Sequence, residues 1–170
     1  MNLSKIIRDI PDFPKKGILF KDITTLLKDA TAFKATIEQM TALYAGKGIT
    51  KVCGAESRGF IFGAPLALAL NAGFVPIRKP GKLPAAKISQ EYTLEYGTDK
   101  IEMHVDAVAK GEKVLIVDDL LATGGTAKAC AQLLSQVGAE IVGFVFLVEL
   151  DFLKGRDLLK GYEITSLVHY

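Results

Sequence analysis

The stretch KVLIVDDLLATGGTAKA at residues 113–129 decides the fold of this chain. It opens with the apolar run of residues 114–117, whose β-branched members are typical of a strand buried on both faces in a parallel sheet. Two carboxylates, Asp118 and Asp119, follow the run, and the small residues 123–126 form a turn behind them. Apolar residues then recur at helical spacing. The stretch therefore predicts a strand, a glycine-rich turn and a helix in immediate succession.

The turn between this strand and this helix suits an anion. Backbone N–H groups at the start of a helix are free, and the positive end of the helix dipole points at the same spot. Its glycines let the backbone approach a ligand closely, and the hydroxyls of Thr123 and Thr126 add donors. The neighbouring carboxylates repel phosphate and need a polyol, a metal ion or a basic ring nitrogen. A sugar phosphate would offer a phosphate to the turn and hydroxyl groups to the carboxylates. The alternative, an exposed acidic turn before an ordinary helix cap, explains the carboxylates or the turn taken alone, but not the two together.

The composition is that of a globular protein. Of 170 residues, 49% are hydrophobic, and a net charge of +2 gives no support for a general nucleic-acid-binding surface. The two cysteines, Cys53 and Cys130, lack paired spacing, which favours packed thiols in a reducing compartment over a disulfide or a metal site. We find no signal peptide and no apolar run of about 18 residues. We expect one cytoplasmic domain spanning residues 1–170.

The rest of the chain alternates between strand and helix patterns. Prolines and a glycine interrupt residues 1–28, which we expect to form an N-terminal arm or hood with a short helix at residues 4–9 and a strand or turn at residues 17–23. Further helices are predicted from Asp29 or Thr31 to Ala45 and at residues 60–71, 127–137 and 152–159, and further strands at residues 50–55, 74–79, 141–148 and 164–168. This alternation predicts an α/β fold with a mostly parallel twisted sheet flanked by helices.

Residues 85–109 break the alternation. Apolar side chains alternate with polar ones at residues 92–96 and again at 101–105, and residues 97–100 carry a turn signal between them. The pattern predicts a β-hairpin that projects from the sheet, and a flexible lid at residues 80–105 would exclude water from a reactive intermediate. A solvated ribbon, or one that packs on another subunit, is the alternative.

Cations follow two of the predicted strands. Arg58, in a turn of small residues, would meet an anion well, and its pairing with Glu56 is an equally good explanation. Arg78, Lys79 and Lys82 lie within five residues. Such a run is usually solvated, but here it follows the end of a parallel strand, where open α/β sheets bind ligands, and this favours polyphosphate contact.

The opening stretch resembles the phosphoribosyl pyrophosphate motif of the type I phosphoribosyltransferases: an apolar strand, two acids, small residues and Thr-Gly-Gly-Thr. Four further stretches narrow the resemblance to the adenine-specific branch of that family. They are DFPKKGILFKDIT at residues 12–24, GAESRGFIFGAPLA at 54–67, RKPGKLP at 78–84 and YTLEYG at 92–97. Together the motifs span essentially the whole chain in the expected order.

The resemblance implies a reaction of purine salvage. Adenine and 5-phosphoribosyl 1-pyrophosphate would give AMP and pyrophosphate through an oxocarbenium-like transition state. Mg²⁺ would be held mainly by the substrate and water, with no protein ligand assigned. The resemblance also implies a cytoplasmic homodimer that binds neither nucleic acid nor a membrane.

Substrate contacts follow from the same resemblance. Spacing alone makes Phe20 a core contact, but the resemblance implies that it stacks on adenine while backbone groups of Leu19 and Lys21 read the edge of the base. Lys21 stands where many relatives have arginine. Contacts to pyrophosphate would come from Glu56, Ser57, Arg58, Gly59, Arg78, Lys79 and Lys82, with a cis peptide bond between Glu56 and Ser57. Contacts to the ribose hydroxyls would come from Asp118 and Asp119, and contacts to the 5-phosphate from Ala122, Thr123, Gly124, Gly125 and Thr126.

Three residues are implied in catalysis. Arg58 and Lys82 would stabilise the negative charge of the departing pyrophosphate. Glu95 would lie over the base with Tyr96 and, if lid closure raises its pKa, would donate a proton to N7 of adenine.

Two alternatives stay open. The base could be hypoxanthine, guanine or orotate, although the Phe20 stretch and the LEYG sequence argue against these. The chain could also be a regulator that keeps the phosphoribosyl site as a sensor and binds nucleic acid, against which the near-neutral charge and the intact acids count. A P-loop nucleoside triphosphatase is excluded because the Gly-Lys-Ser/Thr ending is missing.

Overall fold

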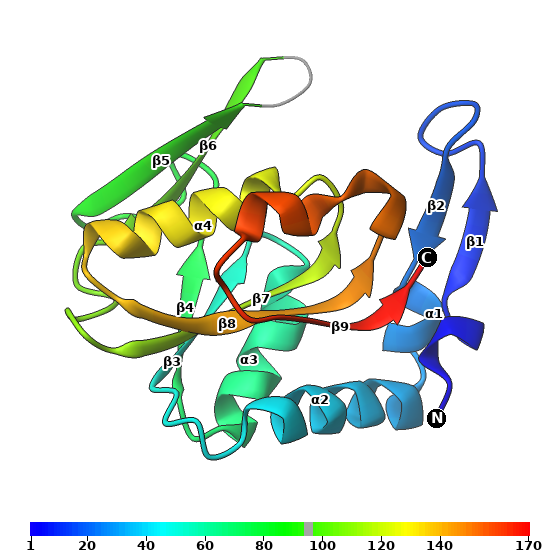
Figure 1. Cartoon of the computed structure of the whole chain (residues 1–170), viewed down its shortest axis with the longest axis horizontal. Coiled ribbons are helices and arrows are strands. Elements are labelled where there is room, and N and C mark those ends of the chain that lie inside the picture. The colour runs from blue at the N-terminus through cyan, green and yellow to red at the C-terminus, as the bar shows by residue number, and fades with distance from the viewer. Residues whose placement is uncertain (94–96) are drawn as a thin grey trace.

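A central sheet organises the computed structural model, which describes residues 1–93 and 97–170 (Figure 1). Five strands lie in the order β4-β3-β7-β8-β9, and every neighbouring pair is parallel. The strands are β3 (Lys51–Ala55), β4 (Gly73–Ile77), β7 (Lys113–Leu121), β8 (Glu140–Glu149) and β9 (Ile164–His169). The predicted mostly parallel sheet is confirmed, although the strand expected at residues 74–79 ends two residues earlier.

Helices cover both faces of the sheet, which explains the unbroken apolar run in β7. The helices are α1 (Thr24–Leu27), α2 (Ala30–Tyr44), α3 (Gly59–Ala69) and α4 (Gly125–Gln136). α2 and α3 lie on one face and α4 on the other (Figure 1). Leu115 and Val117 of β7 pack in the core under α2 and α3, whereas Val114 and Ile116 pack in the core under α4. Every side chain of the run is therefore buried, and no polar alternation is needed.

Local signals place helix α2 correctly. Asp29 is its N-cap, and the carboxylate accepts the backbone N–H groups of Thr31 and Ala32 at 2.9 and 3.0 Å. At the other end of the helix, the buried Tyr44 donates its hydroxyl to the carbonyl oxygen of Phe144 in β8 at 2.9 Å. This bond ties α2 to the sheet.

The N-terminal segment is a two-stranded ribbon, so the helix predicted at residues 4–9 is wrong. The segment consists of the 3₁₀ turn η1 (Leu3–Lys5) and the antiparallel strands β1 (Arg8–Pro11) and β2 (Leu19–Asp22). Pairing with β2 satisfies the backbone of β1, and Arg8 forms an ion pair with Asp22 across the ribbon. The predicted strand or turn at residues 17–23 corresponds to β2.

The predicted hairpin is present, with different bounds. β5 (Lys87–Thr93) pairs antiparallel with β6 (Thr98–His104), so residues 98–100, which were predicted as turn, belong to a strand. Asp99 is held there by Lys79 and Tyr92, a tertiary contact that overrides the local turn signal. The hairpin and the β1–β2 ribbon project beyond the body of the molecule on its two sides (Figure 1).

The C-terminal helix predicted at residues 152–159 is replaced by two 3₁₀ segments. η2 (Asp151–Leu153) and η3 (Gly155–Leu159) are separated by Lys154, whose φ of +53° interrupts the helical geometry. The chain ends beside its beginning, because the hydroxyl of Tyr170 donates to the carbonyl oxygen of Ser4 at 3.2 Å.

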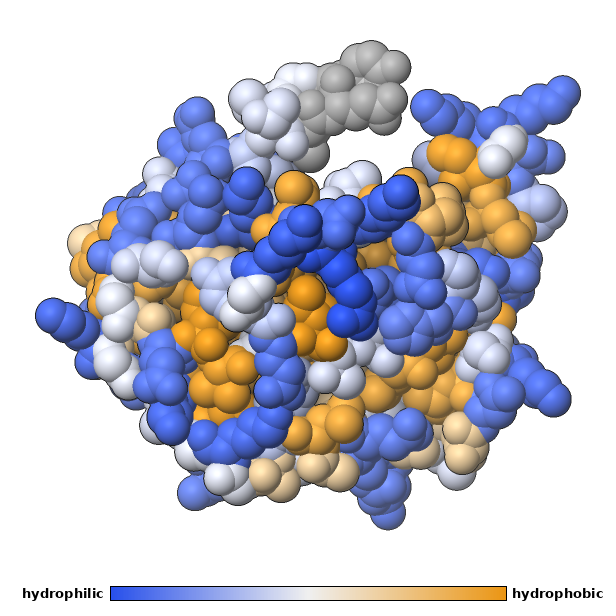
Figure 2. Space-filling model, viewed as in Figure 1, coloured by the Kyte–Doolittle hydropathy of each residue, from blue (hydrophilic) through white to orange (hydrophobic). Residues whose placement is uncertain are grey.

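The surface is mixed. Hydrophilic residues cover much of the face in Figure 2, and hydrophobic ones reach it in separate patches. Among the described residues, no helix combines the length and the apolar character that crossing a membrane requires.

Candidate active site at the carboxyl edge of the sheet

Parallel pairing brings three distant segments of the chain to one edge of the sheet. β3, β4 and β7 are neighbours and run in the same direction, so the residues that follow Ala55, Ile77 and Leu121 all lie at their carboxyl ends. Ligands of open α/β sheets bind at this edge. Most of the residues predicted to bind substrate lie in these three segments.

A polar cavity contains the carboxylates and the glycine-rich turn. Arg58, Asp118, Asp119 and residues 122–126 all line it. Gly124 has φ +85°, a left-handed conformation that suits glycine, and α4 begins at the next residue. The first turn of α4 therefore directs unpaired backbone N–H groups at the cavity, as an anion site requires.

Gly155 of η3 supports this turn from behind. A Cβ atom on Gly124 would lie 3.1 Å from the carbonyl carbon of Gly155 and closer still to its oxygen. The two main chains are therefore in direct contact. Sequence reasoning missed Gly155, and no local pattern around it indicates the contact.

The two carboxylates differ in their partners. Asp119 is 6% exposed, and Nε of Arg58 lies 2.7 Å from its Oδ2 atom. Asp118 accepts the backbone N–H of Asp119 at 2.9 Å and forms no ion pair among the described residues. Burial, together with the negative charge of Asp119, raises the pKa of Asp118 well above its usual value. Burial also raises the pKa of Asp119, although Arg58 opposes it.

Arg58 pairs with Asp119 and not with Glu56, so the sequence-based alternative of a Glu56–Arg58 pair is wrong. Glu56 instead accepts the backbone N–H of Lys79 at 2.9 Å and faces Nε of Arg78 at 3.2 Å. The hydrogen bond from Lys79, followed by those from Arg78, lowers the pKa of Glu56. The peptide bond between Glu56 and Ser57 is cis, as the family resemblance implied.

An apolar cavity adjoins the polar one. It lies between β2 and the ends of β7 and β8, and its lining includes Leu19, Phe20, Lys21, Val148 and Leu150. Arg58, Asp119 and Leu120 line both cavities, so the two share part of their walls.

Phe20 is a wall of this apolar cavity. It belongs to neither core cluster, so the core contact that its spacing suggested is wrong. The ring of Phe13 meets it edge-on at 5.1 Å between centroids, and the guanidinium carbon of Arg58 lies 6.0 Å from its centroid.

The side chain of Lys21 has structural partners. Its ammonium group donates to Asp9 at 2.7 Å and lies 3.6 Å from the centroid of the Tyr170 ring. The side chain is 10% exposed. A ligand in the apolar cavity is therefore left with the backbone of this residue.

The three cations after β4 are not equivalent. Arg78 faces Glu56, and Lys79 forms an ion pair with Asp99 and donates to the Tyr92 hydroxyl at 3.1 Å. Burial alone would lower the pKa of Lys79, but the hydrogen bonds to Asp99 and Tyr92 outweigh it, and the pKa is raised. Lys82 is exposed and has no ion pair within the described part of the chain. Glu95 and Tyr96, the residues predicted to lie over the base, fall outside the described residues.

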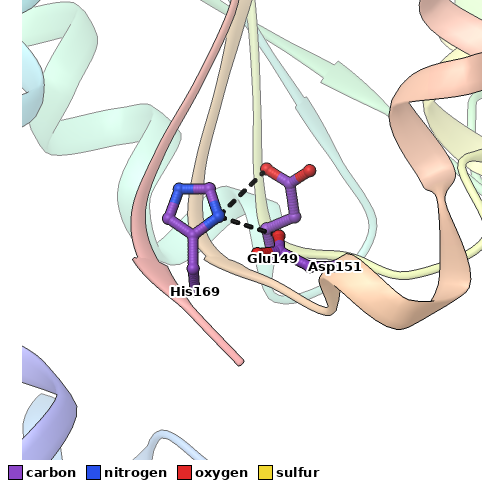
Figure 3. Close-up of side chains that lie close together, drawn as sticks. All are labelled: Glu149, Asp151 and His169. Atoms are coloured by element: carbon purple, nitrogen blue, oxygen red, sulfur yellow. Dashed lines mark hydrogen bonds and ion pairs between the residues drawn. The ribbon is translucent and has the colours of Figure 1, made fainter.

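One group of side chains has the spacing of a metal site, but its charges are already compensated. Glu149, Asp151 and His169 each offer one potential ligand atom, and these atoms all lie within 4.8 Å of one another (Figure 3). Both carboxylate oxygens of Glu149 accept hydrogen bonds from Arg156, at 2.6 and 2.8 Å, and one also accepts from Ser166 at 2.6 Å. A cation would have to displace this guanidinium, so the donor set fits a metal poorly.

Comparison with known proteins gives the class first. Residues 22–164 match the phosphoribosyl transferase domain family. This match covers most of the chain and the whole lining of the polar cavity, whereas residues 18–21 of the apolar cavity precede it.

Close relatives then narrow the class. An adenine phosphoribosyltransferase from Halothermothrix orenii is 60% identical over 168 residues, which cover 99% of each chain. The crystal structure of an adenine phosphoribosyltransferase from Thermoanaerobacter pseudethanolicus superposes with a TM-score of 0.95 at 55% identity, covering 99% of this chain and 98% of that one. The enzyme of the same name from Saccharomyces cerevisiae, complexed with adenine and an imino-altritol bisphosphate, gives a TM-score of 0.92 at 40% identity, covering 97% and 96%.

The chain belongs to the adenine phosphoribosyltransferases, within the phosphoribosyl transferase family. The predicted fold, family and transferase class are thereby confirmed.

Proposed function

We propose that the two adjoining cavities bind adenine and 5-phosphoribosyl 1-pyrophosphate, and that the chain converts them into AMP and pyrophosphate. The observation that carries this assignment is that the two cavities adjoin and share Arg58, Asp119 and Leu120 in their walls. A flat apolar base and a charged sugar phosphate would meet at that border, where the new bond from N9 to C1 of the ribose must form.

The apolar cavity takes the base. Phe20 stacks on adenine, and the backbone of Leu19 and Lys21 reads its edge, because the Lys21 side chain is engaged with Asp9 and Tyr170. The yeast relative, which was crystallised with adenine, supports a base site in this fold.

The polar cavity takes the ribose and its 5-phosphate. Residues 122–126 cradle the phosphate with backbone N–H groups at the start of α4, and Thr123 and Thr126 add hydroxyl donors. Asp118 and Asp119 accept the ribose hydroxyls. Their negative charge also offsets the positive charge that develops on the sugar as the bond to pyrophosphate breaks.

The leaving pyrophosphate lies toward Arg58 and the segment after β4. Lys82 is exposed and can contact the pyrophosphate directly. Arg78 and Lys79 would first exchange their carboxylate partners for phosphate oxygens. The side chain of Arg58, which pairs with Asp119, is 46% exposed and would also contact the pyrophosphate. Glu56, Ser57 and Gly59 contribute through the backbone of the loop that carries Arg58. This arrangement stabilises the charge of the departing group.

Mg²⁺ fits this site as an ion that arrives with the substrate. Asp118 and Asp119 are hard oxygen donors of the kind that Mg²⁺ accepts, and they face the cavity. The ion would neutralise pyrophosphate charge. The substrate and water would supply most of its ligands.

Several further assignments belong to the same proposal. Residues 1–170 form a single domain, in which residues 80–105 act as a lid and residues 1–28 as an N-terminal hood. Glu95 on the lid donates a proton to N7 of adenine, and Tyr96 covers the base. The protein works as a homodimer in the cytoplasm, where its two buried cysteines stay as free thiols.

A base-panel assay tests the proposal. Purified protein is mixed with Mg²⁺, 5-phosphoribosyl 1-pyrophosphate and adenine, hypoxanthine, guanine or orotate, and nucleotide and pyrophosphate are followed. We expect AMP from adenine alone, lost when Mg²⁺ is chelated and lost in the variant that combines Asp118→Asn with Asp119→Asn. Turnover of another base would overturn the assignment of Phe20, and near-normal activity of the double variant would overturn the ribose role of the carboxylates.

A further inference from the structure

The turn proposed to bind the 5-phosphate rests on a second segment that lies far away in the sequence. Gly155, the first residue of η3, is buried, and a Cβ atom on it would lie 3.0 Å from the Leu121 side chain and closer still to the carbonyl oxygen of Ala122. Gly124 is equally close to Gly155 from the other side. Because two main chains meet here without intervening side chains, a shift of η3 moves the turn.

Arg156 fixes the position of Gly155. Its Nε and Nη2 atoms donate to the two carboxylate oxygens of Glu149 at 2.6 and 2.8 Å, and its Nη1 atom donates to the carbonyl oxygen of Ile164 at 3.0 Å. Ser166 donates to Glu149 at 2.6 Å. One guanidinium therefore joins η3 to both β8 and β9. A lysine cannot reproduce this fork of donors.

Glu149, which holds Arg156, also lies next to the turn in the sheet. Glu149 is the register partner of Leu121, the residue before Ala122. Leu150, which follows Glu149, donates its N–H to the carbonyl oxygen of Leu121 at 3.0 Å. The side chain of Glu149 is 4% exposed, and the hydrogen bonds from Arg156 and Ser166 hold its carboxylate in place.

We propose that Arg156, Glu149 and Ser166 are positioning residues for the 5-phosphate turn, acting through Gly155. This inference rests on the proposed function. The network touches neither substrate, and its effect is to hold the backbone N–H groups of residues 122–126 where the phosphate of a ribose 5-phosphate group binds. Loosening the network weakens that phosphate contact more than it weakens binding of adenine, because half of the residues that line the apolar cavity, Ile18 to Lys21 and Ile23, belong to the N-terminal segment.

The test separates binding of the sugar phosphate from binding of the base. For the wild type, Arg156→Lys and Ser166→Ala, titration calorimetry gives the dissociation constant for ribose 5-phosphate, and initial rates give KM for each substrate. A displacement of about 1 Å in a binding group costs up to about 100-fold, so we expect Arg156→Lys to weaken ribose 5-phosphate binding about tenfold or more. Ser166→Ala, which keeps the ion pair, should act in the same direction by about threefold. KM for adenine should change less than about twofold in both.

A matched control accounts for lost stability. Tyr44→Phe removes a buried hydroxyl that bonds the carbonyl oxygen of Phe144 and the Thr165 hydroxyl, neither of which takes part in the hydrogen bonds of the Arg156 network. It should lower the thermal midpoint and leave the ribose 5-phosphate affinity unchanged.

The outcomes are distinguishable. Unchanged ribose 5-phosphate affinity in a folded Arg156→Lys protein, or an equal loss in Tyr44→Phe, would overturn the inference and leave the proposed function standing. A wild-type protein that neither binds ribose 5-phosphate nor makes AMP would overturn the proposed function itself. Should Arg156→Lys fail to fold, Ser166→Ala decides by the same comparison.

Discussion

Replacing Gly124 by alanine tests whether the phosphate turn depends on close packing of two main chains. The left-handed backbone at φ +85° costs an alanine about 1–2 kcal/mol. The new Cβ would also lie 3.1 Å from the carbonyl carbon of Gly155 and nearer to its oxygen, both of which are backbone atoms that cannot rotate away. Overpacking of this kind adds about 1–3 kcal/mol. The free energy of unfolding should therefore fall by about 2–5 kcal/mol.

The matched control is Gly46→Ala, because Gly46 has φ +76° and no atom within 4 Å of an added Cβ. It carries the backbone term alone, about 1–2 kcal/mol, and should leave the kinetics unchanged. Urea unfolding measures the two stability losses, and initial rates measure kcat/KM for 5-phosphoribosyl 1-pyrophosphate, which we expect to drop about 100-fold in Gly124→Ala. Equal losses of stability in the two variants, with equal kinetics, would refute the contact with Gly155.

Three further predictions follow from the site. Because the pKa of Asp118 is raised above 3.8 in the folded state, its carboxylate lowers the stability of the wild type as pH rises through the raised pKa. Asp118→Asn should unfold at higher urea concentration than the wild type at pH 8, with the difference vanishing below about pH 4, and should be inactive; a constant difference across pH would contradict the assignment. Phe20→Leu should raise KM for adenine about three- to tenfold in steady-state assays, and an unchanged KM would remove Phe20 from the base site. Lys82→Met should lower kcat/KM for 5-phosphoribosyl 1-pyrophosphate by roughly 100-fold while the thermal midpoint stays within about 2 °C, since the side chain is exposed; a normal rate would exclude it from catalysis.

Local sequence signals carried most of the central architecture. The apolar run of residues 114–117 could be recognised as a doubly buried strand because its period differs from that of a half-buried one. The cap at Asp29 and the glycines of the phosphate turn likewise act within a few residues of themselves, which is the range that a single sequence reports well.

Segments whose conformation depends on a distant partner were not predictable in this way. Arg8 and Asp9 were predicted to end a short helix, but pairing with β2 places them in strand β1. Residues 98–100 carry a turn signal, and Lys79 holds Asp99 in β6 instead. In both cases tertiary contacts contribute more free energy than local propensity, which is worth only a few tenths of a kcal/mol to about 1 kcal/mol per residue.

The sequence by itself determined the chemistry available to this protein: two acids, a glycine-rich turn, several cations and an aromatic side chain, in an order that resembles one family. Only the tertiary structure decided which of these groups face one another. It paired Arg58 with Asp119 in place of Glu56, made Phe20 a cavity wall, and put Gly155 behind Gly124. These choices depend on how parallel strands align their carboxyl ends and on which charges become buried together, and neither is encoded within a short window of residues.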